Sequence, residues 1–184
     1  MLTFISKNVL SEDEVKLIMN RFDRNEKHLD SLGRAVYNFH TEENAKDRDY
    51  IMDKIDPFFP NNPSFNYVLY GHIAEHQQGA FLPYNVDLFD NVTGMGIVFL
   101  SENVSGGRLI VNDTIVSPTL GTIVCFQEPS IQQFMIETIY DNTKSPLHYI
   151  ICAFTDEEPV FAEDDEPEQE MSSEEEFEVA TVNV

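Results

Sequence analysis

Apolar and polar residues recur with two different periods along this chain, and the period changes near residue 65. Before that point, apolar residues recur every three or four positions, which predicts amphipathic helices. Ser11 and Glu14 have the spacing of a capping box, so we expect the first helix to begin there after the lead-in Phe4–Leu10. Its apolar stripe consists of Val15, Ile18, Met19 and Phe22.

A second helix is predicted to start at Thr41, where Glu42 and Glu43 supply acidic residues for its first turn. Asp56-Pro57 should end it, and the inward positions are Ala45, Ile51, Met52 and Ile55. The intervening segment 34–40, RAVYNFH, is predicted to be a strand. The loop DPFFPNNPS (56–64) contains three prolines and two asparagines, so we expect no regular structure there.

From residue 65 the pattern changes to short apolar runs separated by turn signals, which predicts β-strands. The turn signals include Gly106-Gly107 and Gly121, where glycine permits positive φ. Such regular spacing favours a barrel-like sandwich and gives a mainly β chain with N-terminal helices (α+β). The predicted strands are Phe65–Tyr70, Met95–Leu100, Arg108–Asn112, Thr122–Phe126, Gln133–Ile139 and His148–Phe154.

Four segments resemble, in order and spacing, the prolyl 4-hydroxylase-like branch of the iron(II)- and 2-oxoglutarate-dependent oxygenase superfamily. They are GAFLPYNVD (79–87), SGGRLIVNDTIVSPTLGTIVCF (105–126), QQFMIETI (132–139) and SPLHYIICAFT (145–155). The resemblance implies a double-stranded β-helix core, jelly-roll or cupin-like, over 65–155. Residues 1–64 would then be supporting helices and a strand of the same domain, and 156–184 an acidic tail.

The resemblance also assigns functional positions, and most are occupied by unexpected residues. The family's His-x-Asp motif falls on Asn85 and Asp87, and its distal histidine falls near Gln133 or Phe134. The arginine that pairs with the cosubstrate carboxylate is replaced by His148. Of the four functional positions, Asp87 alone retains the family's residue. The chain has no histidine between His76 and His148, so a shift of alignment cannot recover the missing ligands.

These substitutions weaken both functions of the family's site. Iron(II) in such a site needs two imidazoles and one carboxylate, and an amide or a phenyl ring is a poor replacement. A histidine offers a single donor to a carboxylate, whereas arginine offers a planar, permanently charged fork. We therefore expect a degenerate member of the superfamily with no catalytic residues and no cofactor, neither iron(II) nor 2-oxoglutarate.

An alternative set of metal ligands remains open at this stage. His72 and His76 are four residues apart and share a face, and His76 precedes Gly79 at a position where the family often has a pocket-facing tyrosine. His76, Asp87 and His148 would then hold iron(II) in an active 2-oxoglutarate-dependent protein hydroxylase. The competing interpretation is that these histidines satisfy local hydrogen bonds.

The carboxyl end is the second distinctive feature. From residue 156 onward it holds thirteen of the 33 acidic residues and no lysine or arginine, within a chain of net charge −22. Such a segment is predicted to be disordered or bound to a partner. Residues 177–184 alternate like an edge strand, which suggests strand addition to a partner through four apolar side chains. These are Phe177, Val179, Val182 and Val184.

The charge also limits the partners. Nucleic acids and anionic membranes are disfavoured because there is no basic stripe, so another protein with a basic surface is the expected partner. No apolar run is long enough for a transmembrane helix, and the start lacks a signal-peptide pattern. Cys125 and Cys152 lie in apolar strand patterns and are predicted to be buried free thiols of a reducing compartment.

We therefore predict a non-catalytic oxygenase-fold protein that acts as a binding or structural assembly module, in homo- or hetero-assemblies. Similar proteins occur in tailed bacteriophages, so the predicted location is the cytoplasm, or the virion if the chain has that origin. The atypical hydroxylase is the first alternative. An acidic inhibitor or nucleic-acid mimic is the second, because the acidic residues could occupy another protein's phosphate sites.

Overall fold

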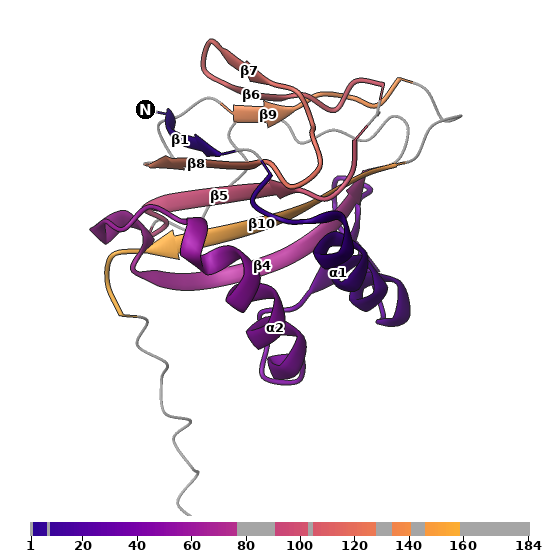
Figure 1. Ribbon diagram of the computed structural model, residues 1–184, viewed down its shortest axis with the longest axis horizontal. Coiled ribbons are helices and arrows are strands. Elements are labelled where there is room, and N and C mark those ends of the chain that lie inside the picture. The colour runs from indigo at the N-terminus through magenta and orange to yellow at the C-terminus, as the bar shows by residue number, and fades with distance from the viewer. Residues whose placement is uncertain are drawn as a thin grey trace, which may run out of the picture.

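The computed structural model describes residues 2–6, 8–76, 91–102, 105–127, 134–140 and 146–158. Two antiparallel sheets face each other, and two helices cover the outer face of the larger one (Figure 1). The large sheet has the order β1 (Leu2–Ser6), β8 (Ile123–Gln127), β5 (Gly94–Phe99), β10 (Leu147–Thr155), β4 (Tyr67–His76), β3 (Ala35–Asn38) and β2 (His28–Leu29). The small sheet has the order β7 (Thr114–Val116), β6 (Leu109–Val111) and β9 (Phe134–Ile136). The predicted mainly β fold with N-terminal helices is confirmed.

Helix α1 (Glu12–Arg24) begins as the sequence predicts. The Ser11 hydroxyl accepts from the Glu14 N–H at 3.3 Å, and the Glu14 carboxylate accepts from the Ser11 N–H at 2.9 Å. This reciprocal capping satisfies two N–H groups that the helix itself leaves without partners. No helix in the described part of the chain is both long and apolar enough to cross a membrane.

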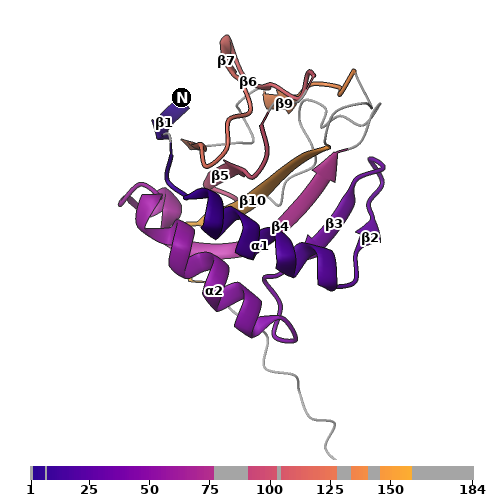
Figure 2. The ribbon, with the colours of Figure 1, turned by 45° about the vertical axis from the view of Figure 1, so that its right-hand side comes forward.

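Helix α2 (Ala45–Ile55) starts four residues later than predicted. Thr41 does not begin the helix; its hydroxyl accepts from the Asn44 N–H at 3.3 Å and closes a turn ahead of it. Ile51 and Ile55 are buried as expected, and both helices pack on the large sheet (Figure 2).

Three other expectations need correction. The loop 56–64 contributes to two 3-10 helices, η1 (Asp56–Phe58) and η2 (Pro63–Phe65), because proline near each start fixes a helical φ. Residues 2–6 form a strand paired with β8 and do not simply lead into the helix. The sequence does not predict strand β7, because the three residues Thr114–Val116 that follow the Asn112-Asp113 turn are too few to show a period-two pattern.

The side chains form two apolar cores, one on each face of the large sheet. The helix-side core contains Ile18, Ile51, Ile73 and Ile150, and the core between the two sheets contains Phe99, Phe126, Leu147 and Tyr149. Because side chains alternate between the faces of a strand, each residue of β4 and β10 is assigned to one core by its position.

The two cysteines are buried and free, as predicted. Both pair with Gly96 of β5, Cys125 from β8 and Cys152 from β10, so β5 lies between them. Two strand spacings are about 9.5 Å, beyond the roughly 7 Å that a disulfide can bridge. Burial raises the pKa of the Cys125 thiol to about 12, which keeps it protonated.

Candidate functional site

The alternation along β10 decides which of its side chains reach the interior between the two sheets. Leu147, Tyr149 and Ile151 belong to the core between the sheets, whereas Ile150 belongs to the helix-side core. His148 therefore points toward the helices, where its ring meets the Phe22 ring edge-on with 5.5 Å between centroids.

His148 is held on that outer side by its neighbour on β4. Its Nε2 lies 2.9 Å from the Glu75 carboxylate, directly across the strand pair. The residue that the sequence places at the cosubstrate position thus faces away from the interior. Leu147 and Tyr149 are its inward-facing neighbours, and neither carries a positive charge.

The interior face carries a chain of four polar side chains that hydrogen-bond to one another. Asp30 pairs with the Arg34 Nε at 2.6 Å, and the Arg34 Nη1 donates to the Tyr149 hydroxyl at 3.0 Å. That hydroxyl lies 2.9 Å from Nε2 of His76, at the end of β4. Since the tyrosine oxygen accepts from arginine, its own proton is free to go to His76. Neutral His76 then carries its proton on Nδ1, which is buried without a partner among the described residues.

Burial keeps His76, His72 and Tyr149 in their neutral forms. Burial, assisted by the Arg34 cation, lowers the pKa of His76 to about 3. The same two causes lower the pKa of His72 to about 3. Burial raises the pKa of Tyr149 to about 12 against the opposing effect of Arg34. None of the three is suited to exchange protons near neutral pH, where a general acid or base works best.

Phe134 is the described residue that the sequence places at the distal iron position. It lies on β9, is almost fully buried between the sheets, and packs against Phe126 with 5.1 Å between ring centroids. An apolar ring therefore occupies this part of the interior. Asn85, Asp87 and Gln133 lie outside the described residues, as do the tail residues Phe177, Val179, Val182 and Val184.

The alternative metal set does not come together in the structure. His76 faces the interior and His148 faces the helices, so the two histidines lie on opposite faces of the sheet and cannot share one ion. No three histidine, cysteine or acidic residues in the described ranges lie close enough to hold a metal ion. His76 and His148 each make a local hydrogen bond, to Tyr149 and Glu75, whereas Nε2 of His72 is buried without a partner among the described residues.

Asp30, Arg34 and Tyr149 were not singled out from the sequence. Arg34 belongs to the segment RAVYNFH, where its inward position is shared with Val36, and that parity is a signal that could have been used. Asp30 and Arg34 are only four residues apart, a spacing at which an ion pair across a turn is common, so the spacing alone does not mark a functional site. Their connection to Tyr149, 115 residues away from Arg34, depends on the sheet order and cannot be seen in the sequence.

No protein-family model matches the chain, and neither does any curated protein sequence. Solved structures do match. A prolyl hydroxylase from Trichoplax adhaerens, in complex with a hypoxia inducible factor oxygen degradation domain peptide fragment, superposes with a TM-score of 0.64 at 15% identity, covering 83% of each chain. HygX from Streptomyces hygroscopicus, with nickel and 2-oxoglutarate bound, gives 0.65 at 10% identity, covering 83% of this chain and 82% of the other.

A viral collagen prolyl hydroxylase from Paramecium Bursaria Chlorella virus-1 gives a TM-score of 0.61 at 13% identity, covering 83% of this chain and 94% of the other. At such identities these likenesses establish a shared fold. The chain therefore has the jelly-roll fold of the 2-oxoglutarate- and iron(II)-dependent oxygenases, as the sequence motifs indicate.

Proposed function

We propose that this chain is a non-catalytic protein with an oxygenase fold, serving as a binding or structural assembly module. The observation that carries the proposal is Phe134. Its ring packs against Phe126 between the sheets, at one of the two positions, Gln133 or Phe134, near which the sequence resemblance expects a metal-binding histidine. With no histidine between His76 and His148, the segments on either side of β9 hold no substitute imidazole.

The inward face of β10 supports the same proposal. Leu147 and Tyr149 take the inward positions at the start of the strand, and the Tyr149 hydroxyl is already engaged by Arg34 and His76. Arg34 is a buried cation that contacts Tyr149, but its charge is already balanced by the Asp30 carboxylate, which lies 2.6 Å from Nε. A cosubstrate carboxylate would have to displace Asp30 in order to form an ion pair with Arg34.

Iron(II) and 2-oxoglutarate therefore do not fit the residues that the structure describes. The buried His76 has one ring nitrogen engaged by Tyr149, Phe134 offers a phenyl ring, and His148 faces the helices. The remaining candidate ligand is Asp87, and a single carboxylate binds a divalent ion weakly.

The direct test is a calorimetric titration of the full-length protein with manganese(II), with and without 2-oxoglutarate. The proposal predicts no binding up to millimolar metal and no tightening by 2-oxoglutarate. Asp87→Ala is the matched control. Micromolar binding by the wild type that Asp87→Ala abolishes would contradict the proposal and favour the atypical hydroxylase.

The acidic tail is the second part of the proposal, and we infer that it contacts a protein with a basic surface. Its charge supports this, because thirteen carboxylates without a lysine or arginine attract cationic surfaces over about a Debye length. If the chain comes from a bacteriophage, a virion component is the form of assembly we propose.

Removing residues 156–184 tests the tail, since β10 ends before them at Thr155. The shortened protein should keep its unfolding midpoint and lose the partner. Cross-linking in extracts of the source should place partner contacts at Phe177, Val179, Val182 and Val184 in the full chain. An unchanged set of cross-linked partners after the deletion would remove this part of the proposal.

A further inference from the structure

Strand β2 forms one edge of the large sheet, as Figure 2 shows. It pairs with β3 on one side, with His28 opposite Val36 and Leu29 opposite Ala35, and no described strand pairs with its other side. Asp30 donates its backbone N–H to the Arg34 carbonyl, toward β3. By the alternation of an antiparallel pair, the backbone N–H and C=O of Leu29 point outward. The Leu29 side chain is 76% exposed.

Two hollows adjoin this edge, and they share His28 and Asn38 in their walls. The first, of about 320 Å³, opens on the face of the sheet that carries Val36, Tyr70 and His72. The second, of about 420 Å³, lies between the β2–β3 hairpin and the ends of the helices. Because successive side chains of a strand point to opposite faces, an added strand would direct neighbouring side chains toward different hollows.

The first hollow suits an apolar or aromatic side chain. Its walls include Val36 and the rings of Tyr70 and His72, which stack almost in parallel at 9° with 6.0 Å between centroids. Two charged residues, Asp30 and Arg34, also line it, and they already pair with each other. An aromatic ring entering here would pack against rings and aliphatic carbon without displacing an ion pair.

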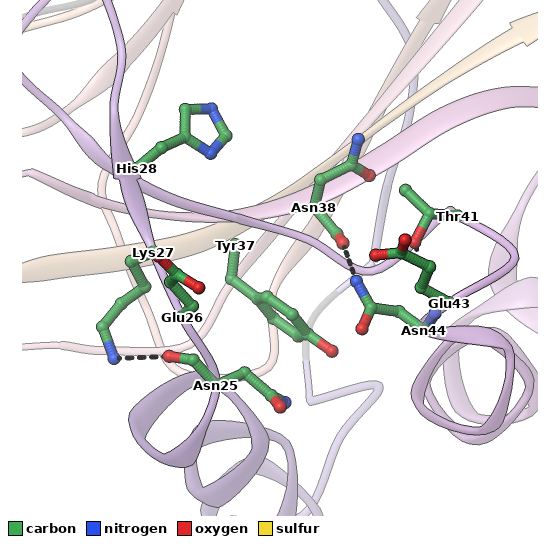
Figure 3. A pocket seen from close by; sticks show the side chains of 9 residues that line it. All are labelled: Asn25, Glu26, Lys27, His28, Tyr37, Asn38, Thr41, Glu43 and Asn44. Atoms are coloured by element: carbon green, nitrogen blue, oxygen red, sulfur yellow. Dashed lines mark hydrogen bonds between the residues drawn. The ribbon is translucent and has the colours of Figure 1, made fainter.

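The second hollow suits a basic side chain. Figure 3 shows Glu26 and Glu43 on its rim, and neither makes an ion pair within the described ranges. Lys27 does not neutralise them, since its ammonium group donates to carbonyls of Phe22, Asp23 and Asn25 at the end of α1. The remaining lining includes the side-chain amides of Asn25 and Asn38 and the hydroxyl of Thr41, whose oxygens can accept hydrogen bonds, together with the His28 ring.

We propose that β2 is a docking edge for an extended segment of a partner protein in which apolar or aromatic residues alternate with lysine or arginine. The segment pairs through its backbone with Leu29 and places its side chains alternately in the two hollows. Strand addition of this kind draws affinity from the backbone bonds and specificity from the alternate pockets. The surface lies outside the interior, so it does not depend on whether the interior is catalytic.

Leu29→Pro tests the edge on the full-length protein. Proline removes the outward N–H, which the fold does not use, and it is tolerated on edge strands. Leu29→Thr is the matched control, since it shortens the side chain but keeps the N–H. The probe is a short fluorescent peptide in which lysine alternates with valine and phenylalanine, measured by anisotropy at physiological ionic strength. Leu29→Pro should weaken binding at least tenfold, and Leu29→Thr by less than threefold.

A second variant tests the charge without altering the backbone. Glu26→Lys combined with Glu43→Lys should weaken binding of the lysine peptide and strengthen binding of a peptide with glutamate in place of lysine. Equal binding by wild type and Leu29→Pro would overturn the proposal, because the peptide would then bind the acidic surface at large. Tighter binding of a synthetic peptide of residues 177–184 than of the lysine peptide would also overturn it, since the edge would then select the chain's own acidic end.

Discussion

The interior between the two sheets and the β2 edge both contain clusters of polar residues, but the two clusters differ in how many of their hydrogen-bonding and charged groups lack a partner. In the interior, Asp30, Arg34, Tyr149 and His76 bond to one another and leave Nδ1 of His76 without a described partner, while Phe134 packs against Phe126. At the edge, the outward backbone groups of Leu29 and two carboxylates have no described partner.

This difference shows why the presence of polar residues alone does not identify a site. Hydrogen-bonding groups that satisfy each other in a buried place hold the fold together, and changing one leaves its partner unsatisfied. Groups with spare capacity at an accessible edge are available to a ligand. The interior should therefore respond to substitution with a loss of stability, and the edge with a loss of binding.

The largest expected effect is at Gly107, which lies just before β6. Gly107 has φ of +67°, and a Cβ there would lie 2.7 Å from the Ile139 side chain and 2.9 Å from that of Leu147. Gly107→Val should lower the free energy of unfolding by about 4 kcal/mol, from backbone strain and overpacking together. Urea unfolding measures it.

Gly33→Val is the matched control for this prediction. Gly33 also has positive φ, +76°, but a Cβ there meets nothing within 4 Å. It should cost about 1–2 kcal/mol, the backbone strain alone. Equal losses at the two glycines would mean that the interior is not tightly packed at Gly107.

The second-largest effect is expected from acid, which should lower the stability of the interior. The folded pKa of His76, about 3, lies below the unfolded value of about 6.5, so stability is full above pH 6.5 and falls as pH drops toward 3. Between pH 7 and pH 5 the loss should be about 2 kcal/mol for His76, and His72 acts in the same direction. Asp30 has a lowered pKa and contributes its own loss only at lower pH.

Urea unfolding of the wild type and His76→Gln at both pH values isolates this contribution. The variant should be less stable at pH 7 but show a shallower pH dependence. An identical pH dependence in the two proteins would mean that His76 titrates alike in the folded and unfolded states.

Removing one hydroxyl from each face of the sheet compares their hydrogen-bond networks. Tyr149→Phe leaves Arg34 Nη1 and His76 Nε2 without their partner, and should cost about 1–3 kcal/mol. Tyr37→Phe, on the helix side, removes a donor to Asp47, which keeps Asn25 and two arginines. It should cost about 0.5–1 kcal/mol. A larger loss of stability in Tyr37→Phe than in Tyr149→Phe would contradict the hydrogen-bond network proposed for the interior.

The smallest effect is expected at Asp87. With no pair of imidazoles to share a metal, Asp87→Ala should leave stability within about 0.5 kcal/mol of the wild type in the presence of manganese(II). A metal-dependent rise in the unfolding midpoint of the wild type that the variant lacks would show that Asp87 still binds an ion.

The sequence predicted much of this fold because its local signals are strong. The capping box at Ser11 and the apolar runs of β5, β8 and β10 each define an element without help from the rest of the chain. Strand β2 has two residues with no alternation, so the edge it forms follows from the sheet order alone.

The site was harder to predict, because a shift of one residue along a strand exchanges its two faces. The sequence places His148 at a functional position, and the register turns it toward Phe22 and Glu75. Leu147 and Tyr149 take the inward positions instead. The hydrogen bonds of Arg34 and Tyr149 join distant segments, so no spacing in the chain indicates them.

The most direct test of the inactive interior is a turnover measurement. The full-length protein is incubated with iron(II), ascorbate, oxygen and 2-oxoglutarate, and succinate is quantified against a blank without protein. An inactive interior should give succinate equal to the blank at every protein concentration. Succinate that rises with protein concentration and disappears in Asp87→Ala would contradict it, and would place a working metal centre within this fold.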